Sequence, residues 1–530
     1  SEIIGEAALD YDRRQRRLGM VYGAGHAAEV MMQDAETRAS IEQYAKGVNL
    51  YIESLDTDDL PLEYKLLNYK PEPWTPVKAG LLLKNLSQTL NISENDLEMT
   101  NALELFGKDM VDLLYFDSDH PTGDPIVSNP GGWKFPPLKL DDTLALALPT
   151  ELVDLPKQEK GRGIGSNNWA VSGSRTASGA PLLANDPHLS LSFPSIWYVS
   201  HLHSPGVNVM GATIPGAPGI VIGFNDSIAW GETNAQRDVV DWYKIQFQDG
   251  QRNAYMSDGE WKPVTKKIEK FIVRGGEPFY DTVTYTHHGP VVYDNSFHGD
   301  EERSGYAFRW ISHDGSNELK ALYLLNRAHN HTDYMKALEH WVAPAQNFVF
   351  ASVTGDIAMR IQGKFPVRRK DEGKFLIDGT KTSYEWKAFI PFEQNVMIKN
   401  PARGFVSSAN QFPADSTYPY YINGANYETY RNRRINHVLA EKDSLGPEDM
   451  MTLQNDNYNL QAAESLPMML PMLDKTSLSG KESQVAVALG SWDYYNQPQS
   501  LAATYYEVWW RLLRSLLWHE MQNEKDSLEA

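Results

Sequence analysis

The chain contains no cysteine. Disulfide bonds, thiol catalysis and zinc–thiolate sites are therefore all excluded. No apolar run reaches the length that a membrane span requires. The first residues, SEIIGEAALD, include neither an initiator methionine nor the apolar segment of a signal peptide. We expect a soluble globular protein whose N-terminal segment is missing from this sequence.

Positive charge is scarce in this chain. Its 49 Lys and Arg residues stand against 69 Asp and Glu residues, which gives a formal net charge of -20. Nucleic-acid backbones are bound by clustered Lys and Arg, so this balance argues against nucleic acid as a partner. The 530 residues are 42% hydrophobic, which is enough for several domains or for one large layered domain.

Residues 1–150 are predicted to form a mostly helical region. Apolar residues recur there at helical spacing, as in Ile41, Ala45 and Val48. The next segment, 151–165 (ELVDLPKQEKGRGIG), is charged and glycine-bearing, which is typical of an exposed linker.

From residue 166 to 530 the pattern changes to short β-branched or aromatic segments between Gly, Pro and Asn-Asp turns. This pattern predicts antiparallel strands, including a hairpin at 348–361 (FVFASVTGDIAMRI). Helical patterns return at 332–342 and at 505–521. The predicted fold class is therefore α+β.

Ser166 follows the linker directly, in GRGIGSNNWAVSG. A nucleophile elbow of the G-x-S-x-G type is excluded, because Ile164 and Asn168 occupy its glycine positions. Ser166 could simply end the linker, since serine is common in turns. It could instead become an N-terminus by cleavage after Gly165. A free α-amino group has a pKa of about 7.7–8.0, so Ser166 would then supply both nucleophile and base.

Several motifs resemble the penicillin acylase family of N-terminal-nucleophile hydrolases, and the likeness spans most of the chain. The motifs are SNNWAVSGSRTASGAPLLANDPHL, MGATIPGAPGIVIGFNDSIAWGETN, THHGPVV, QNFVFASVTGDIAMRIQG and NPARGFVSSANQFP. The resemblance implies a four-layer αββα core and self-cleavage between Gly165 and Ser166 into an α/β heterodimer. It also implies hydrolysis of a linear amide, such as a β-lactam side chain, an N-acyl-homoserine lactone or a related N-acyl compound.

The resemblance also assigns catalytic roles. Ser166 matches the nucleophile, while the Asn410 side chain and the Asn234 backbone match the donors that hold the oxyanion. His188 matches a histidine close to the nucleophile, and Arg431 matches the arginine that holds the oxyanion asparagine and the N-terminal amine. Taken alone, each of these residues would be an ordinary loop or surface residue.

A structural calcium ion is a further implication of the resemblance. Glu94, Asp238, Asp241 and the carbonyl group of Val240 match the family's calcium ligands. Calcium takes six to eight oxygen ligands, so these segments could be joined by one ion. Without the resemblance, Asp-x-x-Asp is usually a solvated loop.

Leu189, Ile222 and Val349 match positions that line the acyl pocket of penicillin G acylases. An aliphatic lining favours a flexible acyl chain over a phenylacetyl ring. The histidines at 201–203 have the alternate spacing of a strand, and no third metal ligand is close in sequence. The HHGP motif at 287–290 resembles a turn of the family more than a metal site.

The motif match includes neither end of the family's chains, so we expect a truncated sequence that lacks an export signal and belongs to a periplasmic or secreted protein. Two rival functions stay open. A β-rich, acidic chain could be a glycoside hydrolase with paired carboxylates. The chain could also be a non-catalytic binding protein or an unprocessed precursor.

Overall fold

The computed structural model describes residues 1–91, 95–115, 123–140, 148–150, 152–153, 165–299, 301–424 and 428–518. Most of the predicted linker, 151–165, lies outside these ranges, so its character and the domain division stay predictions. No helix among the described residues combines the length and the apolar character needed to cross a membrane.

The N-terminal part of the chain is helical, as the periodicity predicts. Its α-helices are α1 (Leu9–Arg17), α2 (Met20–Gln33), α3 (Ala35–Ser54), α4 (Leu62–Leu67), α5 (Pro76–Asn91), α6 (Asn95–Phe106) and α7 (Lys108–Leu114). The side chain of Asp34 caps α3 by accepting a hydrogen bond from the Thr37 N–H. Ile41 and Ala45 are buried on one face of this helix.

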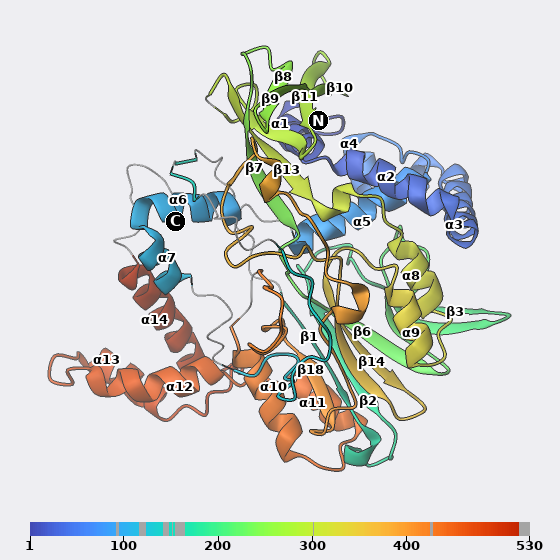
Figure 1. Ribbon diagram of the computed structural model, residues 1–530. Coiled ribbons are helices and arrows are strands. Elements are labelled where there is room, and N and C mark those ends of the chain that lie inside the picture. The colour runs from blue at the N-terminus through green and yellow to red at the C-terminus, as the bar shows by residue number, and fades with distance from the viewer. Residues whose placement is uncertain are drawn as a thin grey trace.

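Two sheets face each other in the lower half of Figure 1. The smaller sheet has the order β18-β1-β2, and the larger one has the order β17-β15-β14-β6-β5-β4-β3. Strands β1 and β2 pack against β6 and β14. The strands of the small sheet are β1 (Gly165–Val171), β2 (Leu182–His188) and β18 (Phe405–Ser408). Those of the large sheet are β3 (Tyr198–Ser204), β4 (Val207–Thr213), β5 (Ile222–Asn225), β6 (Ile228–Asn234), β14 (Gln346–Ser352), β15 (Ile357–Gln362) and β17 (Met397–Lys399).

Helices cover the outer faces of this pair of sheets, which completes four layers. Helices α8 (Glu318–Leu325) and α9 (His331–Leu338) pack on the large sheet through a core that includes Trp230, Phe348 and Phe350. Helices α10 (Tyr430–Glu441) and α11 (Pro447–Gln454) cover the small sheet. The order helix, sheet, sheet, helix confirms the predicted αββα core (Figure 1).

Side chains alternate between the two faces of β1. Trp169 and Val171 belong to the cluster under α10 and α11, whereas Ala170 belongs to the core that includes Val349 of the large sheet. The predicted hairpin is confirmed: β14 and β15 pair antiparallel, and Gly355 at its tip has a φ of +96°.

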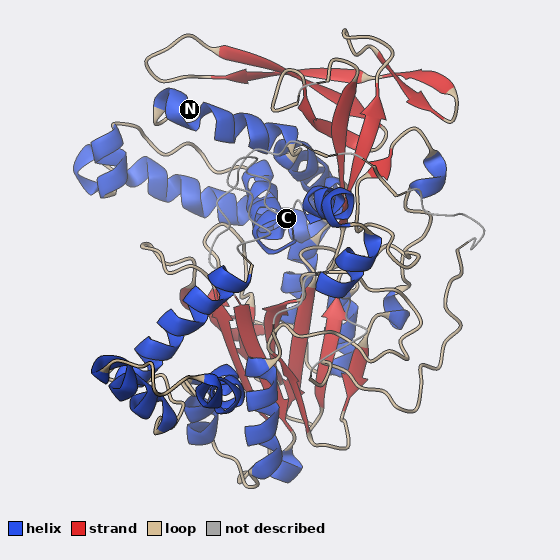
Figure 2. Ribbon diagram, turned by 90° about the vertical axis from the view of Figure 1, so that its left-hand side faces the viewer, coloured by secondary structure: helices blue, strands red, loops and turns tan. Residues whose placement is uncertain are grey.

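A third sheet lies beside the N-terminal helices (Figure 2). Its order is β10-β11-β12-β13-β7-β16, and a two-stranded ribbon, β8-β9, lies nearby. Its strands are β7 (Val240–Gln246), β10 (Thr265–Phe271), β11 (Phe279–Thr286), β12 (Gly289–Asp294), β13 (Ser304–Trp310) and β16 (Ile377–Asp378). The ribbon comprises β8 (Ala254–Ser257) and β9 (Glu260–Pro263). Helices α12 (Leu460–Met469), α13 (Gly480–Gly490) and α14 (Leu501–Leu517) form a separate group with its own small core.

Candidate active site

Ser166 is the second residue of β1, the central strand of the small sheet, and it is 5% exposed. The alternation along β1 puts its side chain on the face toward the large sheet. The Ser166 N–H donates a hydrogen bond of 2.7 Å to Oδ1 of Asn410. The hydroxyl donates one of 2.7 Å to the carbonyl oxygen of Gly165. The hydroxyl therefore lies beside the peptide bond whose cleavage would free the amine.

Arg431, the second residue of α10, holds this part of β1 from the helix side. Its Nη1 donates to the Ser166 carbonyl oxygen at 2.9 Å and to Oδ1 of Asn167 at 2.7 Å, and its Nη2 donates to Oδ1 of Asn410 at 3.0 Å. A Cβ atom at residue 165 would lie 2.8 Å from Nη2 of Arg431. Glycine at 165 therefore allows the guanidinium to approach the backbone closely.

The neighbouring arginines on α10 point elsewhere. Arg433 pairs with Glu464, and Arg434 pairs with Asp456 at 2.7 Å. Arg431 is thus the arginine of this run that contacts the predicted nucleophile.

Asn410 joins Ser166 to β6 through both ends of its side-chain amide. While Oδ1 accepts from Ser166 and Arg431, Nδ2 donates to the carbonyl oxygen of Asn234 at 2.8 Å. An amide NH₂ group has two hydrogens, and this bond uses one of them. Asn410 has a φ of +67°, a left-handed conformation that asparagine tolerates better than most residues.

Asn234, the last residue of β6, lies opposite Gln346 of β14. The next N–H along the chain, that of Ala235, donates to the carbonyl oxygen of Ala345 at 3.1 Å. Because an antiparallel strand directs successive N–H groups to opposite sides, the Asn234 N–H points away from β14. The Asn234 side chain is buried and donates from Nδ2 to the Leu90 carbonyl oxygen at 3.0 Å.

His188 lies opposite Gly165 in the pairing of β1 with β2. Within the described part of the chain, its hydrogen bonds go to Asp186 and Asn167 and not to Ser166. Nε2 is 2.6 Å from Oδ2 of Asp186 and 3.3 Å from Nδ2 of Asn167. The Asn167 Nδ2 also donates to Oδ2 of Asp186 at 3.0 Å. His188 is therefore connected to the site through Asn167.

Sequence reasoning missed Asn167 and Asp186. Asn167 links the Asp186–His188 pair to Arg431 and thereby to Asn410. The sequence does hold one indication of this role. Asn167 and Asn168 directly follow Ser166, and consecutive side chains of a strand face opposite sides.

Glu232 is a buried carboxyl group on β6, two residues before Asn234. It pairs with Phe348, whose side chain belongs to the core under α8 and α9, so it faces away from Ser166. Its Oε1 has no hydrogen-bond partner among the described atoms. Burial raises the pKa of Glu232 to about 8, so the group is mostly uncharged at pH 7.

The predicted calcium ligands lie apart from Ser166 and its partners. Glu94 lies outside the described residues, but Asp238, Asp241 and the Val240 carbonyl surround the guanidinium of Arg368. The nitrogen–oxygen distances are 3.3 Å to Asp238, 2.9 Å to Asp241 and 3.3 Å to Val240. Because a cationic side chain fills the space between these oxygens, the residues present do not fit a calcium ion at this point.

The predicted pocket residues do not share one cluster. Val349 is fully buried in the core between the two facing sheets. Ile222 packs against the core on the outer face of the large sheet. Leu189 directly follows β2 and is half-buried. Val349 is the member of this set that shares the inter-sheet face with Ser166.

The two histidine motifs occupy the elements that the sequence predicts. His201 and His203 lie on β3, and His201 is 2.8 Å from Oδ1 of Asn208. His287 and His288 form the turn between β11 and β12, and His287 contacts Tyr255 and Glu385.

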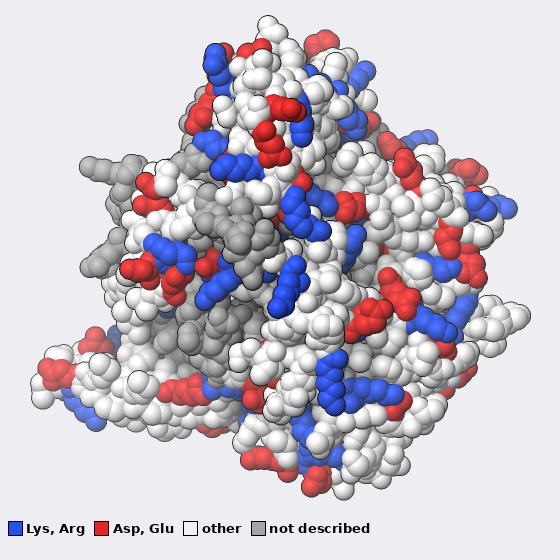
Figure 3. Space-filling view, viewed as in Figure 1, with Lys and Arg blue, Asp and Glu red and all other residues white. Residues whose placement is uncertain are grey.

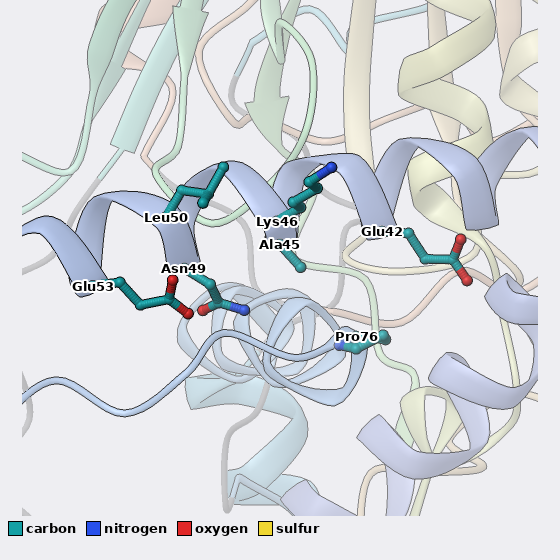
Figure 4. A pocket seen from close by; sticks show the side chains of 7 residues that line it. All are labelled: Glu42, Ala45, Lys46, Asn49, Leu50, Glu53 and Pro76. Carbon is teal, nitrogen blue, oxygen red and sulfur yellow. The ribbon is translucent and has the colours of Figure 1, made fainter.

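A surface pocket of about 390 Å³ lies between α3 and the start of α5, far along the chain from Ser166 (Figure 4). It is lined by Glu42, Ala45, Lys46, Asn49, Leu50, Glu53 and Pro76. Asn49 exchanges two hydrogen bonds with the Trp74 backbone, at 3.1 and 2.6 Å. The pocket therefore lies at a junction between helices, and its lining contains no serine, threonine or cysteine.

The chain is similar to known proteins over nearly its whole length. A family model described as penicillin amidase matches residues 1–529. The acyl-homoserine lactone acylase QuiP of Pseudomonas aeruginosa is 29% identical over 486 residues, which cover 88% of this chain and 55% of that protein. Penicillin acylase 2 proenzyme of Pseudomonas sp. strain SE83 is 27% identical over 529 residues, covering 98% of this chain and 66% of that protein.

A thermostable penicillin G acylase from Alcaligenes faecalis has a similar fold. The TM-score is 0.54 at 24% identity, and the match covers 63% of this chain and 60% of that one. This chain spans about half to two thirds of the length of the relatives that it matches. With a family model matched along nearly its whole length, the chain belongs to the penicillin amidase family.

Proposed function

We propose that this protein is an acylase that hydrolyses a linear amide through Ser166. The observation that carries the proposal is the contact of Ser166 with Asn410, because one amide group holds the nucleophile's nitrogen at 2.7 Å and reaches the Asn234 carbonyl at 2.8 Å. The enzyme names of the relatives support the reaction class.

Self-cleavage is the first step of the proposal. The Ser166 hydroxyl oxygen attacks the Gly165 carbonyl carbon, the hydroxyl proton passes to the amide nitrogen, and the C–N bond breaks as an ester forms. Water then hydrolyses the ester, which leaves the Gly165 carboxylate and the free amine and hydroxyl of Ser166. The hydroxyl's position beside Gly165 and the proenzyme name of one relative support this step.

Amide hydrolysis uses the freed amine as base. The amine takes the hydroxyl proton as Oγ attacks the substrate carbonyl carbon, and it then protonates the leaving amine. The second Nδ2 hydrogen of Asn410 and the Asn234 N–H are the proposed donors to the oxyanion. Water, deprotonated by the same amine, cleaves the acyl-enzyme and releases a carboxylic acid. Arg431 positions Asn410, and His188 supports the site through Asn167.

The proposed substrate is an N-acyl compound of the kinds that the relatives' names give, an acyl-homoserine lactone or a penicillin. The aliphatic side chain of Val349, on the inter-sheet face with Ser166, favours a flexible acyl chain. Acidic and basic side chains are interspersed on the face that Figure 3 shows. That mixture gives no reason to expect a strongly charged substrate.

The test is a denaturing gel of the purified protein with N-terminal sequencing of every band. We expect wild type to yield a fragment that begins SNNWAV, and Ser166→Ala to stay intact at 59.8 kDa. Ser172→Ala is the matched control, because its hydroxyl is exposed and bonds to Ser174 instead. Cleaved wild type should then hydrolyse N-acyl substrates. Cleavage of Ser166→Ala at the same bond, or activity without cleavage, would refute the proposal.

A further inference from the structure

Four ionisable side chains from three segments meet beside the six-stranded sheet. Asp96 lies on α6, Asp238 precedes β7, Asp241 lies on β7, and Arg368 lies in the loop between β15 and β16. Asp96, Asp241 and Arg368 are buried, and Asp238 is half-buried. A buried charge is retained only when it is paired, so Asp238 and Asp241 depend on the guanidinium that contacts both.

The guanidinium makes converging contacts with this group. Its Nη1 lies 2.9 and 3.0 Å from the two carboxylate oxygens of Asp241. Its Nη2 lies 3.3 Å from Oδ2 of Asp238 and donates to the Val240 carbonyl oxygen at 3.3 Å. Two carboxylates and a carbonyl directed at one point are the donor types of a divalent-cation site.

The surrounding residues fix Arg368 and its partners. A Cβ atom on Gly373, which has a φ of +80°, would lie 2.1 Å from Nη1 of Arg368, so the loop closes tightly over the guanidinium. Trp386 Nε1 donates to Asp241, and Asn423 Nδ2 donates to Asp238 at 3.2 Å. The guanidinium is therefore held in one orientation.

The same loop ties the helical region to the sheet. The Leu376 N–H donates to Oγ1 of Thr100 on α6 at 2.8 Å, and Phe375 packs with Ala102, Leu103 and Val111 of α6 and α7. Arg368 thus lies where the helical segment before Ser166 meets the strands that follow it. A cation at this point joins the two parts that cleavage at Gly165–Ser166 would separate.

Arg368 pairs with two of the three carboxyl groups, those of Asp238 and Asp241, and Oδ2 of the third, Asp96, has no hydrogen-bond partner among the described atoms. A calcium ion 2.3–2.6 Å from these oxygens would overlap the guanidinium nitrogens. The cluster can therefore hold the arginine or the metal ion, but not both.

We propose that the Arg368 guanidinium replaces a structural divalent cation in this protein, and that its removal turns the cluster of Asp96, Asp238 and Asp241 into a calcium site. Wild type is then independent of calcium, whereas a variant without the guanidinium depends on it.

The test compares thermal unfolding in EDTA and in millimolar calcium chloride. We expect the midpoint of wild type to change by less than about 1 °C and that of Arg368→Ala to rise by about 5 °C with calcium. Terbium is a second probe, because Trp386 contacts Asp241 and can sensitise its luminescence. We expect a terbium signal, displaced by calcium, in the variant alone. Arg369→Ala is the matched control, since Arg369 pairs with Glu372 in the same loop and should show no calcium effect.

A wild-type protein that binds one calcium ion, or that loses stability in EDTA, would overturn the proposal. So would an Arg368→Ala protein that is folded but indifferent to calcium and terbium. If Arg368→Ala does not fold, the shorter, polar and uncharged Arg368→Gln is refolded with and without calcium. Recovery with calcium supports the proposal, and failure under both conditions overturns it.

Discussion

Asn410→Asp tests the proposed chemistry most directly. An aspartate keeps Oδ1, which accepts from Ser166 and Arg431, but replaces Nδ2 with a second oxygen. That oxygen would lie about 2.8 Å from the Asn234 carbonyl oxygen, where the structure has a donated hydrogen bond. The variant therefore keeps the amine in place while it loses the side-chain donor to the oxyanion. A protonated aspartate could restore the donor, so the assay is run above pH 7.

The size of the effect follows from the loss of one preorganised donor. Removal of such a donor costs about 2.7–4 kcal/mol of transition-state stabilisation, which corresponds to a 10²–10³-fold fall in kcat. KM should change little, because the oxyanion is absent from the bound substrate. The assay measures steady-state hydrolysis of a chromogenic N-acyl amide by fully cleaved protein.

The control for this variant is Asn400→Asp. Asn400 is also an asparagine with positive φ, at 48°, but it lies in a surface loop and bonds to Asp356. The activity of Asn400→Asp per folded molecule should equal that of wild type. A kcat for Asn410→Asp within about tenfold of wild type would refute the assigned role, because a lost oxyanion donor cannot have so small an effect.

Three further predictions concern the supports of the site and the core. Gly165→Ala should slow self-cleavage about tenfold in a gel time course, because the new Cβ displaces Arg431 from its hydrogen bonds; an unchanged rate would contradict this. Asn167→Ala should lower kcat about fivefold and alter the pH profile, since it disconnects His188 from the site; an unchanged kcat and pH profile would show that this link is only structural. Because burial raises the pKa of Glu232 to about 8, the wild-type free energy of unfolding should fall as pH rises from about 4.5 to about 8. Glu232→Gln should remove that slope and be more stable than wild type at pH 8 by up to about 4 kcal/mol in urea unfolding; an equal difference at pH 5 and pH 8 would exclude this cause.

The sequence predicts features that depend on neighbouring residues. The α3 helix and the β14–β15 hairpin follow from spacing and turn residues, and both are confirmed. The family, and with it the αββα core, follows from a combination of motifs. The roles of individual site residues and the place of the protein in the cell stay predictions.

Features that depend on distant segments could not be predicted. Arg368 lies 127 positions from Asp241, so its occupation of the acidic cluster emerges only when the loop folds over β7. The sequence alone could not show which arginine of α10 contacts Ser166. The answer depends on the direction of the Arg431, Arg433 and Arg434 side chains. The role of Asn167 could not be predicted, because it depends on a contact with Arg431, which lies 264 residues away in the sequence.

The alternation along β1 sets a limit on how this segment can change by insertion or deletion. Ser166 faces the opposite sheet, and the intervening Asn167 faces α10. Adding or deleting one residue before Trp169 would exchange these faces, and the serine would point toward the arginine's helix. Gene variants of this segment should therefore retain the number of residues from Ser166 to Trp169, even where neighbouring loops vary in length.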